Sequence, residues 1–341
     1  MIIVAGHLCL DVIPAFAGPA RLDPGSLVRV GAATFSTGGV SNVGVALHRL
    51  GTPVKLIHKI GDDLFGQAVR LLLGAMSTQL ASGVRTVPGE TTSYSIVVAP
   101  PGVDRMFIHS PGANDTFDEQ DVEQGALAGA SHLHFGYPPI MRRIYSDGGA
   151  SCRAIMDRAH AAGLTTSLDF CSVDASSDAG QVDWTRWLKA VLPAVDFFMP
   201  SLEEVSQSFG VPVSFEYESL VRLLNRLAEM GPSFVMLKLG DRGLIALDRS
   251  TGRIHTQPCF KVNVKSANGS GDCTIAGFLT ARLLKRRSVE ESLAFASATG
   301  ACACEAADAT GGVPQSEVVE NRMSGEWDCL PGVSRRQPGG A

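Results

Sequence analysis

Three small residues and one carboxylate stand directly before an apolar helical pattern in the segment KSANGSGDCTIAGFL, residues 265–279. The small residues are Gly269, Ser270 and Gly271, and the carboxylate is Asp272. A helix N-terminus carries unpaired backbone N–H groups and the positive end of the helix dipole, so it binds anions, and small residues let a bound group come close. The segment therefore predicts an oxyanion or phosphoryl site with Asp272 as a general base. An ordinary helix start, which favours the same residues, explains this segment alone equally well.

A second segment, STGGVSNVGVALHRLG at residues 36–51, combines a Gly38-Gly39 turn with Asn42 one turn into a helical pattern. It resembles the N-terminal signature of the ribokinase-like (PfkB) carbohydrate kinase family, in which G-G-x-x-N binds substrate hydroxyls. Residues 265–279 resemble that family's C-terminal signature, D-T-x-G-A-G-D followed by a helix of small residues. Both signatures occur in the family's order, with strand–helix alternation between them, so together they are far more specific than either one alone.

Other elements occur where the resemblance predicts them, over roughly residues 1–320. Asp11 follows the first predicted strand and matches the carboxylate that binds sugar hydroxyls in the family. The segment PSLEEVSQSFG resembles the N-x-x-E element that helps to place Mg²⁺, with Ser201 in the Asn position and Glu204 in the Glu position. The segment LKLGDRGLIALD resembles the strand-turn-strand that lies along the nucleotide phosphates. Its candidate nucleotide-binding residues are Lys238, Gly240, Asp241 and Gly243.

The resemblance implies an ATP-dependent kinase that transfers the γ-phosphate to a hydroxyl of a sugar or sugar-like small molecule. Asp272 would accept the hydroxyl proton, the amides of residues 269–271 would hold the phosphoryl oxygens, and Glu204 would position Mg²⁺ with the ATP phosphates. The substrate would be oriented by Asp11, Gly38, Gly39 and Asn42. A nucleoside kinase of the same family is left open, as is a non-catalytic relative that acts as a binding or scaffold protein.

Motifs of other enzyme classes are missing. The sequence has no G-x-x-x-x-G-K-[ST], which argues against a P-loop NTPase. It also has no G-x-S-x-G, and no G-x-G-x-x-G after the first predicted strand, which argues against a hydrolase or a dehydrogenase on a doubly wound sheet.

The chain departs from the family pattern at three places. Ser266-Ala267 replaces the leading Asp-Thr of the C-terminal signature, and that Asp belongs to a monovalent-cation site in many members, so K⁺ activation is left open. Ser201 replaces an Asn, and the serine is a weaker partner for hydrated Mg²⁺ than the asparagine would be. Val40 stands where a small residue is usual. None of the three departures removes the predicted base or anion site, and together they indicate a divergent member whose substrate is left open.

The elements that would position these residues alternate along the chain. Short β-branched runs such as MIIVAG, PVKLIHKIG and SFVMLKLG are separated by helical patterns such as LFGQAVRLLLGAM and SLVRLLNRLAEMG. This pattern predicts an α/β fold, a ribokinase-like open and mostly parallel sheet with helices on both faces. Strands without an intervening helix at about 12–36 and 91–110 predict a small antiparallel β lid. We predict one kinase domain over 1–321 and a loosely ordered tail over 322–341.

Composition limits the remaining classes. The 341 residues are 45% hydrophobic and carry a net charge of −5, and no basic stripe predicts nucleic-acid binding. The eight cysteines form no CxxC pair, the N-terminus lacks signal-peptide features, and no apolar run has the length of a membrane span. We therefore expect a cytoplasmic protein whose partner is a small molecule, not a nucleic acid or a membrane. Exposed lid strands make a homodimer through the lid plausible.

A few further side chains have types and positions that could suit a site. Asp169 ends a predicted strand at the edge of the sheet where ligands gather, and it is a candidate of second rank. Arg105 on the predicted lid is read as a solvated residue, and Asn114 in SPGANDTF as a turn residue. His132 and His134 share one strand face without a third ligand nearby, which favours a structural role over a metal site.

Overall fold

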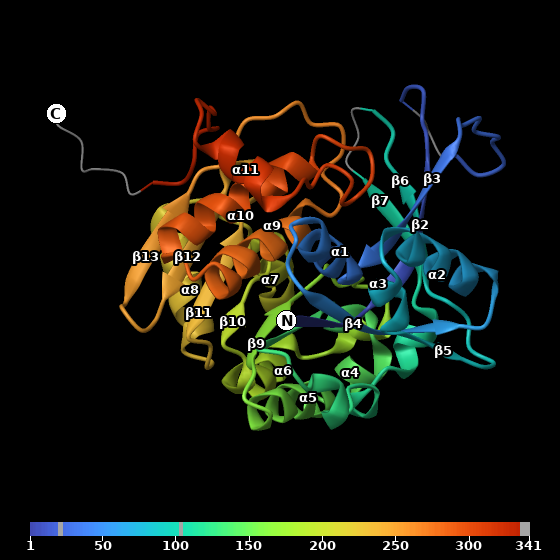
Figure 1. The fold of residues 1–341 in the computed structure, drawn as a ribbon, viewed down its shortest axis with the longest axis horizontal. Helices are drawn as coiled ribbons and strands as arrows, with labels where there is room; N and C mark the ends of the chain where they lie inside the picture. The colour runs from blue at the N-terminus through green and yellow to red at the C-terminus, as the bar shows by residue number, and fades with distance from the viewer. Residues whose placement is uncertain (20–22, 102–104, 335–341) are drawn as a thin grey trace.

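A nine-stranded sheet forms the centre of the computed structural model, which describes residues 1–19, 23–101 and 105–334 (Figure 1). The strand order is β13-β12-β11-β10-β9-β8-β1-β4-β5. All pairs from β5 to β11 are parallel, whereas β12 pairs with β11 and with β13 in antiparallel fashion. The predicted open, mostly parallel sheet is thereby confirmed. The strands are β1 Ile2–Gly6, β4 Val54–Gly61, β5 Val84–Val87, β8 His132–Gly136, β9 Thr165–Asp169, β10 Phe197–Phe198, β11 Phe234–Lys238, β12 Leu244–Asp248 and β13 Arg253–Gln257.

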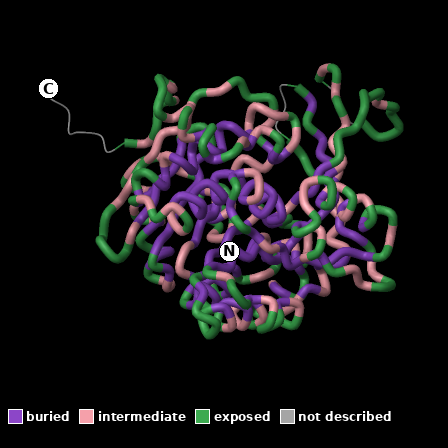
Figure 2. The backbone as a smooth tube through the Cα atoms, in the orientation of Figure 1, coloured by how far each residue is buried: buried purple, intermediate pink, exposed green. Residues whose placement is uncertain are grey.

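Helices cover both faces of this sheet, as the continuous apolar strands predict. Apolar side chains of α4 to α8 pack on one face, and those of α1 to α3 and α9 to α11 pack on the other. Figure 2 shows the buried backbone concentrated between these layers. The helices are α1 Ser41–Arg49, α2 Leu64–Met76, α3 Thr78–Ser82, α4 Arg142–Ser146, α5 Ala150–Ala161, α6 Trp184–Val191, α7 Leu202–Phe209, α8 Tyr217–Ala228, α9 Ser270–Leu279, α10 Val289–Ala303 and α11 Ser316–Met323.

A second, four-stranded sheet stands off one end of the main body and forms the lid (Figure 1). Its strand order is β3-β2-β6-β7, with β2 Leu8–Pro14, β3 Ala33–Gly39, β6 Tyr94–Val98 and β7 Met106–Ser110. The outer pairs are antiparallel, and the central pair β2·β6 is parallel. The lid begins at Leu8, a few residues earlier than the sequence pattern indicates, because β2 continues almost directly from β1.

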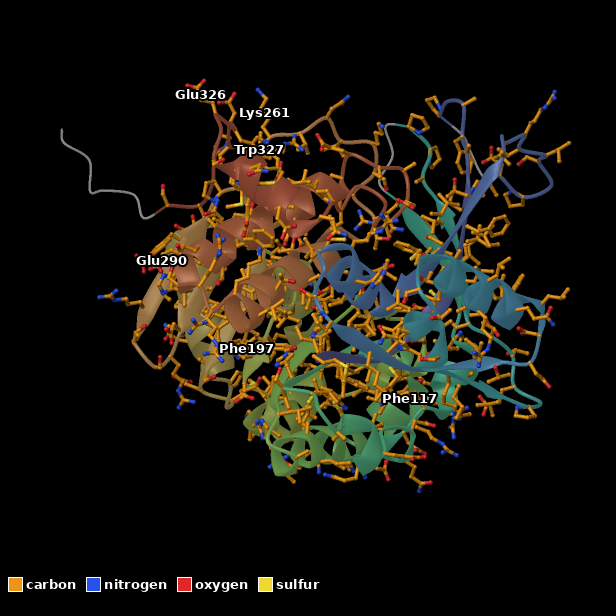
Figure 3. All side chains as sticks on the ribbon, in the orientation of Figure 1. Phe117, Phe197, Lys261, Glu290, Glu326 and Trp327 are labelled. Carbon is orange, nitrogen blue, oxygen red and sulfur yellow. The ribbon has the colours of Figure 1, made fainter. Side chains whose placement is uncertain are left out.

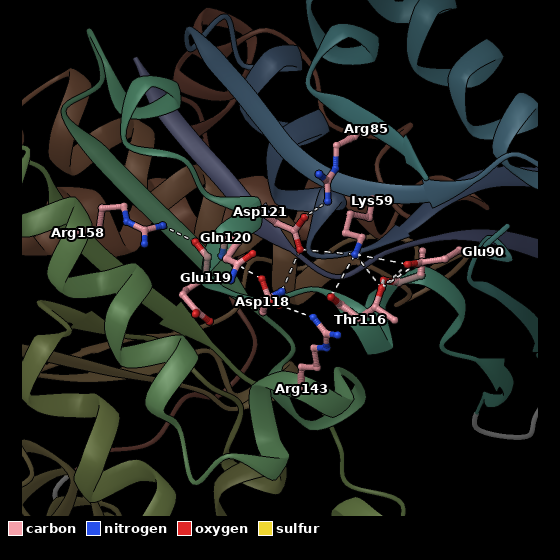
Figure 4. A network of polar contacts seen from close by, with 11 residues as sticks. Lys59, Arg85, Glu90, Thr116, Asp118, Glu119, Gln120, Asp121, Arg143 and Arg158 are labelled. Atoms are coloured by element: carbon pink, nitrogen blue, oxygen red, sulfur yellow. Dashed lines mark hydrogen bonds and ion pairs between the residues drawn. The ribbon is translucent and has the colours of Figure 1, made fainter. Parts of the chain in front are cut away.

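Two polar anchors hold the base of the lid to the body. Asn114 accepts a hydrogen bond from Leu8 N at 3.1 Å and donates one to Leu8 O at 2.9 Å, so it braces the start of β2, a structural role in line with its reading as a turn residue. Lys59 on β4 donates to Thr116 Oγ1 at 2.7 Å and lies 3.8 Å from Glu90 and 3.6 Å from Asp121 (Figure 4). These contacts fix the segments that enter and leave the β6–β7 hairpin.

The described part of the predicted tail, residues 322–334, makes several contacts with the body. Trp327 stacks on Phe260 with ring centroids 4.6 Å apart, and its Nε1 donates to Lys261 O at 2.9 Å (Figure 3). Cys329 forms a β-bridge with Phe260. Backbone hydrogen bonds from Lys261 N to Asp328 O and from Leu330 N to Cys259 O also join this segment to the body. The rest of the predicted tail, residues 335–341, lies outside the described residues.

Within the described ranges, no helix is both long and apolar enough to cross a membrane. All eight cysteines are described, and all are free thiols.

Candidate functional site

The predicted anion-binding turn lies at the mouth of α9. Gly269 has φ of +70°, and a Cβ added there would lie 2.5 Å from Ala309 Cβ, so the position requires glycine. Helix α9 begins at Ser270, which places Gly271 and Asp272 in its first turn. The first amides of a helix have no partner within the helix, and they are the groups an anion would use.

Asp272 is only 4% exposed and is held by two donors. Asn42 Nδ2 donates to Oδ2 at 3.1 Å, and Tyr137 OH donates to Oδ1 at 2.9 Å. Burial raises the pKa of Asp272 to about 6, and the ammonium of Lys238 and these two hydrogen bonds limit the rise. The carboxyl group is thus ionised at neutral pH and close to the pKa that suits a general base.

Sequence reasoning missed Tyr137. It follows β8 with φ of +69°, a left-handed conformation that is uncommon for a tyrosine and is enriched at functional sites. Its hydroxyl reaches Asp272 across 135 positions of sequence. No local signal could have found it, because a Tyr after an apolar strand usually packs.

The predicted substrate residues gather beside Asp272. Asp11 on β2 is 4% exposed, and its carboxylate lies so close to Gly38 that a Cβ there would be 2.3 Å from Oδ1. Gly39 has φ of +71°, and its Cβ would lie 2.2 Å from His7 Nδ1. Burial raises the pKa of Asp11 to about 6, and hydrogen bonds that favour the charged form of the carboxyl group limit this rise. Gly38 is therefore needed for the packing beside the carboxylate, and Gly39 for the packing beside the His7 ring.

Two buried amide side chains of this site each have one polar atom without a hydrogen bond among the described residues. Asn42 uses Nδ2 on Asp272, but its Oδ1 is buried without a hydrogen bond. Asn268, which favours the charged form of Asp11, has a buried Nδ2 without a partner of ordinary hydrogen-bond length. An unpaired buried acceptor and donor are costly unless a ligand satisfies them. A polyhydroxyl compound offers both kinds of group.

Lys238 ends β11 and lies on the other side of the α9 mouth. Its Nζ donates to Asp169 Oδ1 at 2.8 Å and to Oδ2 at 2.9 Å, and a Cβ on Gly271 would lie 3.5 Å from Nζ. Burial alone would lower the pKa of Lys238, but Asp169 and Glu204 offset this and raise it above its ordinary value. Asp169, the second-rank candidate, thus positions an ammonium group beside the predicted phosphoryl site.

Glu204 lies in the first turn of α7 and forms a capping box with Ser201. Glu204 Oε2 accepts from Ser201 N at 2.7 Å, and Ser201 Oγ accepts from Glu204 N at 3.2 Å. The serine in the Asn position is therefore engaged as a helix cap. Burial raises the pKa of Glu204 to about 7, with Asp169 adding to the rise and Lys238 opposing it. The other oxygen, Oε1, makes no hydrogen bond within the described residues, so a hydrated Mg²⁺ fits this donor.

The remaining nucleotide candidates lie in the turn between β11 and β12. Gly240 and Asp241 are exposed, and Gly240 has φ of +60° with open space around its Cα. Gly243 is different, because a Cβ there would lie 2.0 Å from Gln257 O, so this glycine serves the packing of the strands. The turn lies at the carboxyl edge of the sheet, within two to five residues of Lys238.

The departures from the family pattern have local structural counterparts. Val40 packs against Gly136, where a Cβ would lie 2.5 Å from Val40 Cγ2, so the larger residue is matched by a smaller one across the contact. Ser266 N donates to Cys304 O, and Ser270 N donates to Ala267 O, so the altered pair still forms an ordered turn before α9.

Two secondary expectations also have outcomes. His132 bonds Thr165 Oγ1 and Ser167 Oγ at 2.8 and 2.7 Å, and His134 bonds the same Ser167 at 2.7 Å. Their predicted structural role is confirmed. Arg105 is exposed, in agreement with its reading as a solvated lid residue.

The family model that matches this chain and two of its curated relatives are described as carbohydrate kinases or fructokinases. The family model described as pfkB family carbohydrate kinase matches residues 1–316. Fructokinase-1 of Zea mays is 26% identical over 333 residues, covering 94% of this chain and 97% of the relative. Probable fructokinase-6, chloroplastic, of Arabidopsis thaliana is 23% identical over 334 residues, covering 94% and 82%.

Solved structures share the fold at low sequence identity. The ribokinase from Giardia lamblia superposes with a TM-score of 0.78 at 17% identity, covering 95% of this chain and 98% of that one. The Arabidopsis thaliana ribokinase complexed with ribose and ATP gives a TM-score of 0.74 at 19% identity, covering 95% and 99%.

Proposed function

The chain belongs to the pfkB family of carbohydrate kinases, and we propose that it transfers the γ-phosphate of ATP to a hydroxyl of a sugar, with Asp272 as the base. The observation that carries the proposal is the position of this carboxylate. It lies in the first turn of α9 and accepts a hydrogen bond from Asn42 on the proposed substrate side. It is also close enough to Lys238 for the ammonium charge to lower its pKa. A base between a polyol pocket and an anion site is the arrangement that phosphoryl transfer needs.

On the acceptor side, the chain's own residues bind and orient the hydroxyl. Asp11 and the unpaired Asn42 Oδ1 accept hydrogen bonds from substrate hydroxyls, and the unpaired Asn268 Nδ2 donates one. The attacking hydroxyl takes the place of one of the two donors on Asp272 and gives up its proton to that oxygen as its P–O bond to the γ-phosphorus forms, while the bond from that phosphorus to the β,γ-bridging oxygen breaks and ADP leaves. The pKa of about 6 keeps the carboxylate ready to receive this proton at neutral pH.

On the phosphate side, positive charge is fixed before the nucleotide binds. Ser270 N already donates to Ala267 O, so the remaining first-turn amides of α9 and the ammonium of Lys238 stabilise charge on the transferring group, and Asp169 holds that ammonium in place. Glu204 is the residue that would hold hydrated Mg²⁺, which when bound supplies charge neutralisation for the ATP phosphates. The turn with Gly240 and Asp241 lines the nucleotide end of the same edge.

The charges of the proposed acceptor-binding residues and the names of the relatives both indicate which substrates to test. No cation is among the residues proposed to bind the acceptor, and their polar atoms suit neutral hydroxyls. Relatives named fructokinase and structural neighbours named ribokinase make fructose and ribose the first compounds to test. A nucleoside kinase from Methanocaldococcus jannaschii has the same fold, with a TM-score of 0.70 at 18% identity, so nucleosides belong in the same screen.

The test is a coupled ADP-release assay across ketohexoses, aldopentoses, sugar acids and nucleosides. We expect turnover with at least one neutral sugar and none above background with Asp272→Asn. Turnover with a nucleoside alone would replace the sugar by that acceptor. If ATP binds and every acceptor fails, the chain is a non-catalytic relative, which is the reading that its departures at Ser201 and Ser266 would favour.

We also propose that the protein forms a homodimer through the lid. Phe35, Met106 and Ile108 share the face of the lid opposite Asp11 by register, and they are 51%, 49% and 54% exposed. An exposed apolar face on a strand edge is normally covered. Sedimentation equilibrium should give a dimer for the wild type and a monomer for a Phe35→Lys, Ile108→Lys variant. A monomeric wild type would refute this proposal.

A further inference from the structure

Three side chains with metal-binding donors meet at the foot of the lid. Among residues 1–19, 23–101 and 105–334, His7, Cys9 and His109 form a group in which one donor atom of each lies within 4.8 Å of the other two. His7 lies between β1 and β2, Cys9 lies on β2, and His109 lies on the edge strand β7. None of them takes part in the phosphoryl-transfer mechanism above. Two imidazoles and a thiol are a donor set that suits zinc and not magnesium.

The distances fit a tetrahedral ion. His7 Nε2 and His109 Nε2 are 3.3 Å apart. Two nitrogens bound to one tetrahedral zinc at ordinary bond lengths are separated by about 3.3 Å, and a nitrogen and a sulfur by about 3.6 Å. The thiol donor therefore has to approach by no more than about 1.2 Å, which a side-chain rotation supplies.

One neighbouring hydroxyl orients a ligand ring, and another contacts a nitrogen that the metal would take over. Ser95 Oγ lies 2.9 Å from His109 Nδ1, which fixes the ring and leaves Nε2 for a metal when Nδ1 donates. The same hydroxyl lies 3.7 Å from Cys9 Sγ. Ser93 Oγ lies 3.4 Å from His7 Nε2 on the other side of the group. Without a metal, the two facing Nε2 atoms can share only one hydrogen, so the pair is satisfied by a single N–H···N contact.

We propose that His7, Cys9 and His109 bind one Zn²⁺ ion at the foot of the lid, with the fourth position taken by water or by an oxygen of a bound ligand. Each imidazole gives the lone pair of one ring nitrogen. Cys9 binds as a thiolate, and its proton leaves to the solvent as the Zn–S bond forms.

The site would connect the metal to the substrate pocket. Cys9 Sγ donates to Asp11 Oδ1 at 3.3 Å, so zinc on Cys9 removes a hydrogen bond from the carboxylate proposed to bind the sugar. Zinc would also join β7 to the segment between β1 and β2, which ties the lid to its hinge. Zinc is therefore expected to weaken acceptor binding and raise the KM for the sugar at least tenfold.

Cobalt is the probe that reports these ligands directly. The full-length chain, reduced and freed of metal with a chelator, is titrated with Co²⁺. We expect a thiolate-to-cobalt charge-transfer band and the strong visible bands of a tetrahedral ion, saturating at one equivalent. Zn²⁺ should bleach both sets of bands. This reading needs no substrate and no activity, so it is independent of the proposed kinase function.

Matched variants identify the ligands. His109→Phe and Cys9→Ala should each lower the apparent Co²⁺ affinity at least tenfold, and Cys9→Ala should remove the charge-transfer band. The controls are Cys329→Ser and His48→Gln, an exposed thiol and a partly buried histidine outside the group, which should leave the titration unchanged. A wild type without the charge-transfer band, or a band that persists in Cys9→Ala, overturns the proposal, and the wild-type result decides even if a variant fails to fold.

Discussion

The hydroxyl of Tyr137 is the most informative single group to remove, because it touches the proposed base and nothing in the sequence pointed to it. Tyr137→Phe deletes the donor that lies 2.9 Å from Asp272 Oδ1 while keeping the ring. The ring lies against His7 at a centroid distance of 6.1 Å, and Phe can keep that contact and the backbone conformation. The change therefore isolates one hydrogen bond to one carboxylate.

The size and sign of the effect follow from that bond. A hydrogen bond to a charged group contributes about 1.5–3 kcal/mol, and 1.36 kcal/mol corresponds to one pKa unit, so the pKa of Asp272 should rise by about 1–2 units. From about 6 in the wild type it would move to about 7–8 in the variant. Because the base must be ionised, activity is lost on the acid side, and at pH 7 the variant should retain a minority of wild-type kcat/KM. Above pH 9 the two proteins should converge.

The assay is the pH profile of kcat/KM for the acceptor at saturating ATP. Tyr145→Phe is the matched control, since Tyr145 packs on Trp184 and should leave the profile unchanged. An acid limb that stays in place in Tyr137→Phe, or that moves to lower pH, would refute the reasoning about this carboxylate.

Three further perturbations test other parts of the site. Gly269→Ala should abolish turnover because the added Cβ would clash with Ala309. Its control is Gly252→Ala, at a similar φ of +67° with open space around it, which should lower the unfolding free energy by only about 1 kcal/mol and leave activity unchanged. Lys238→Met should lower the urea-derived unfolding free energy by about 3–5 kcal/mol by leaving a buried carboxylate unpaired, and the exposed Lys261→Met should change it by less than about 0.5 kcal/mol. Glu204→Gln should raise the Mg²⁺ concentration for half-maximal activity by about tenfold, and an unchanged Mg²⁺ dependence would remove Glu204 from the metal site.

The sequence predicts the fold well where the evidence is local. Apolar strands and amphipathic helices alternate, and glycines with positive φ such as Gly39 and Gly269 stand where turns need them. These features depend on neighbours in sequence, and periodicity and turn chemistry read them directly. Composition alone does not indicate the contacts of the tail, such as the hydrogen bond from Trp327 Nε1 to Lys261 O, because these contacts join residues far apart in the sequence.

The site is only partly accessible from sequence because its decisive contacts are long-range. The motifs predict Asp272 and Asn42 as site residues. They do not predict Tyr137, whose hydroxyl contacts Asp272 from the end of β8. The pairing of Lys238 with Asp169 likewise depends on the order of strands in the sheet, which no local pattern encodes. The grouping of His7, Cys9 and His109 depends on how the lid folds back on its hinge.

The central claim concerns the carboxylate at the mouth of α9, and single-turnover phosphoryl transfer tests it most directly. The rate of ADP formation is measured with enzyme in excess over ATP, at saturating acceptor, for the wild type and for Asp272→Asn, with ATP binding measured separately in both. We predict a rate at least 100-fold lower in the variant with ATP affinity within about threefold of the wild type. Equal rates in the two proteins would contradict the assignment of Asp272 as the base.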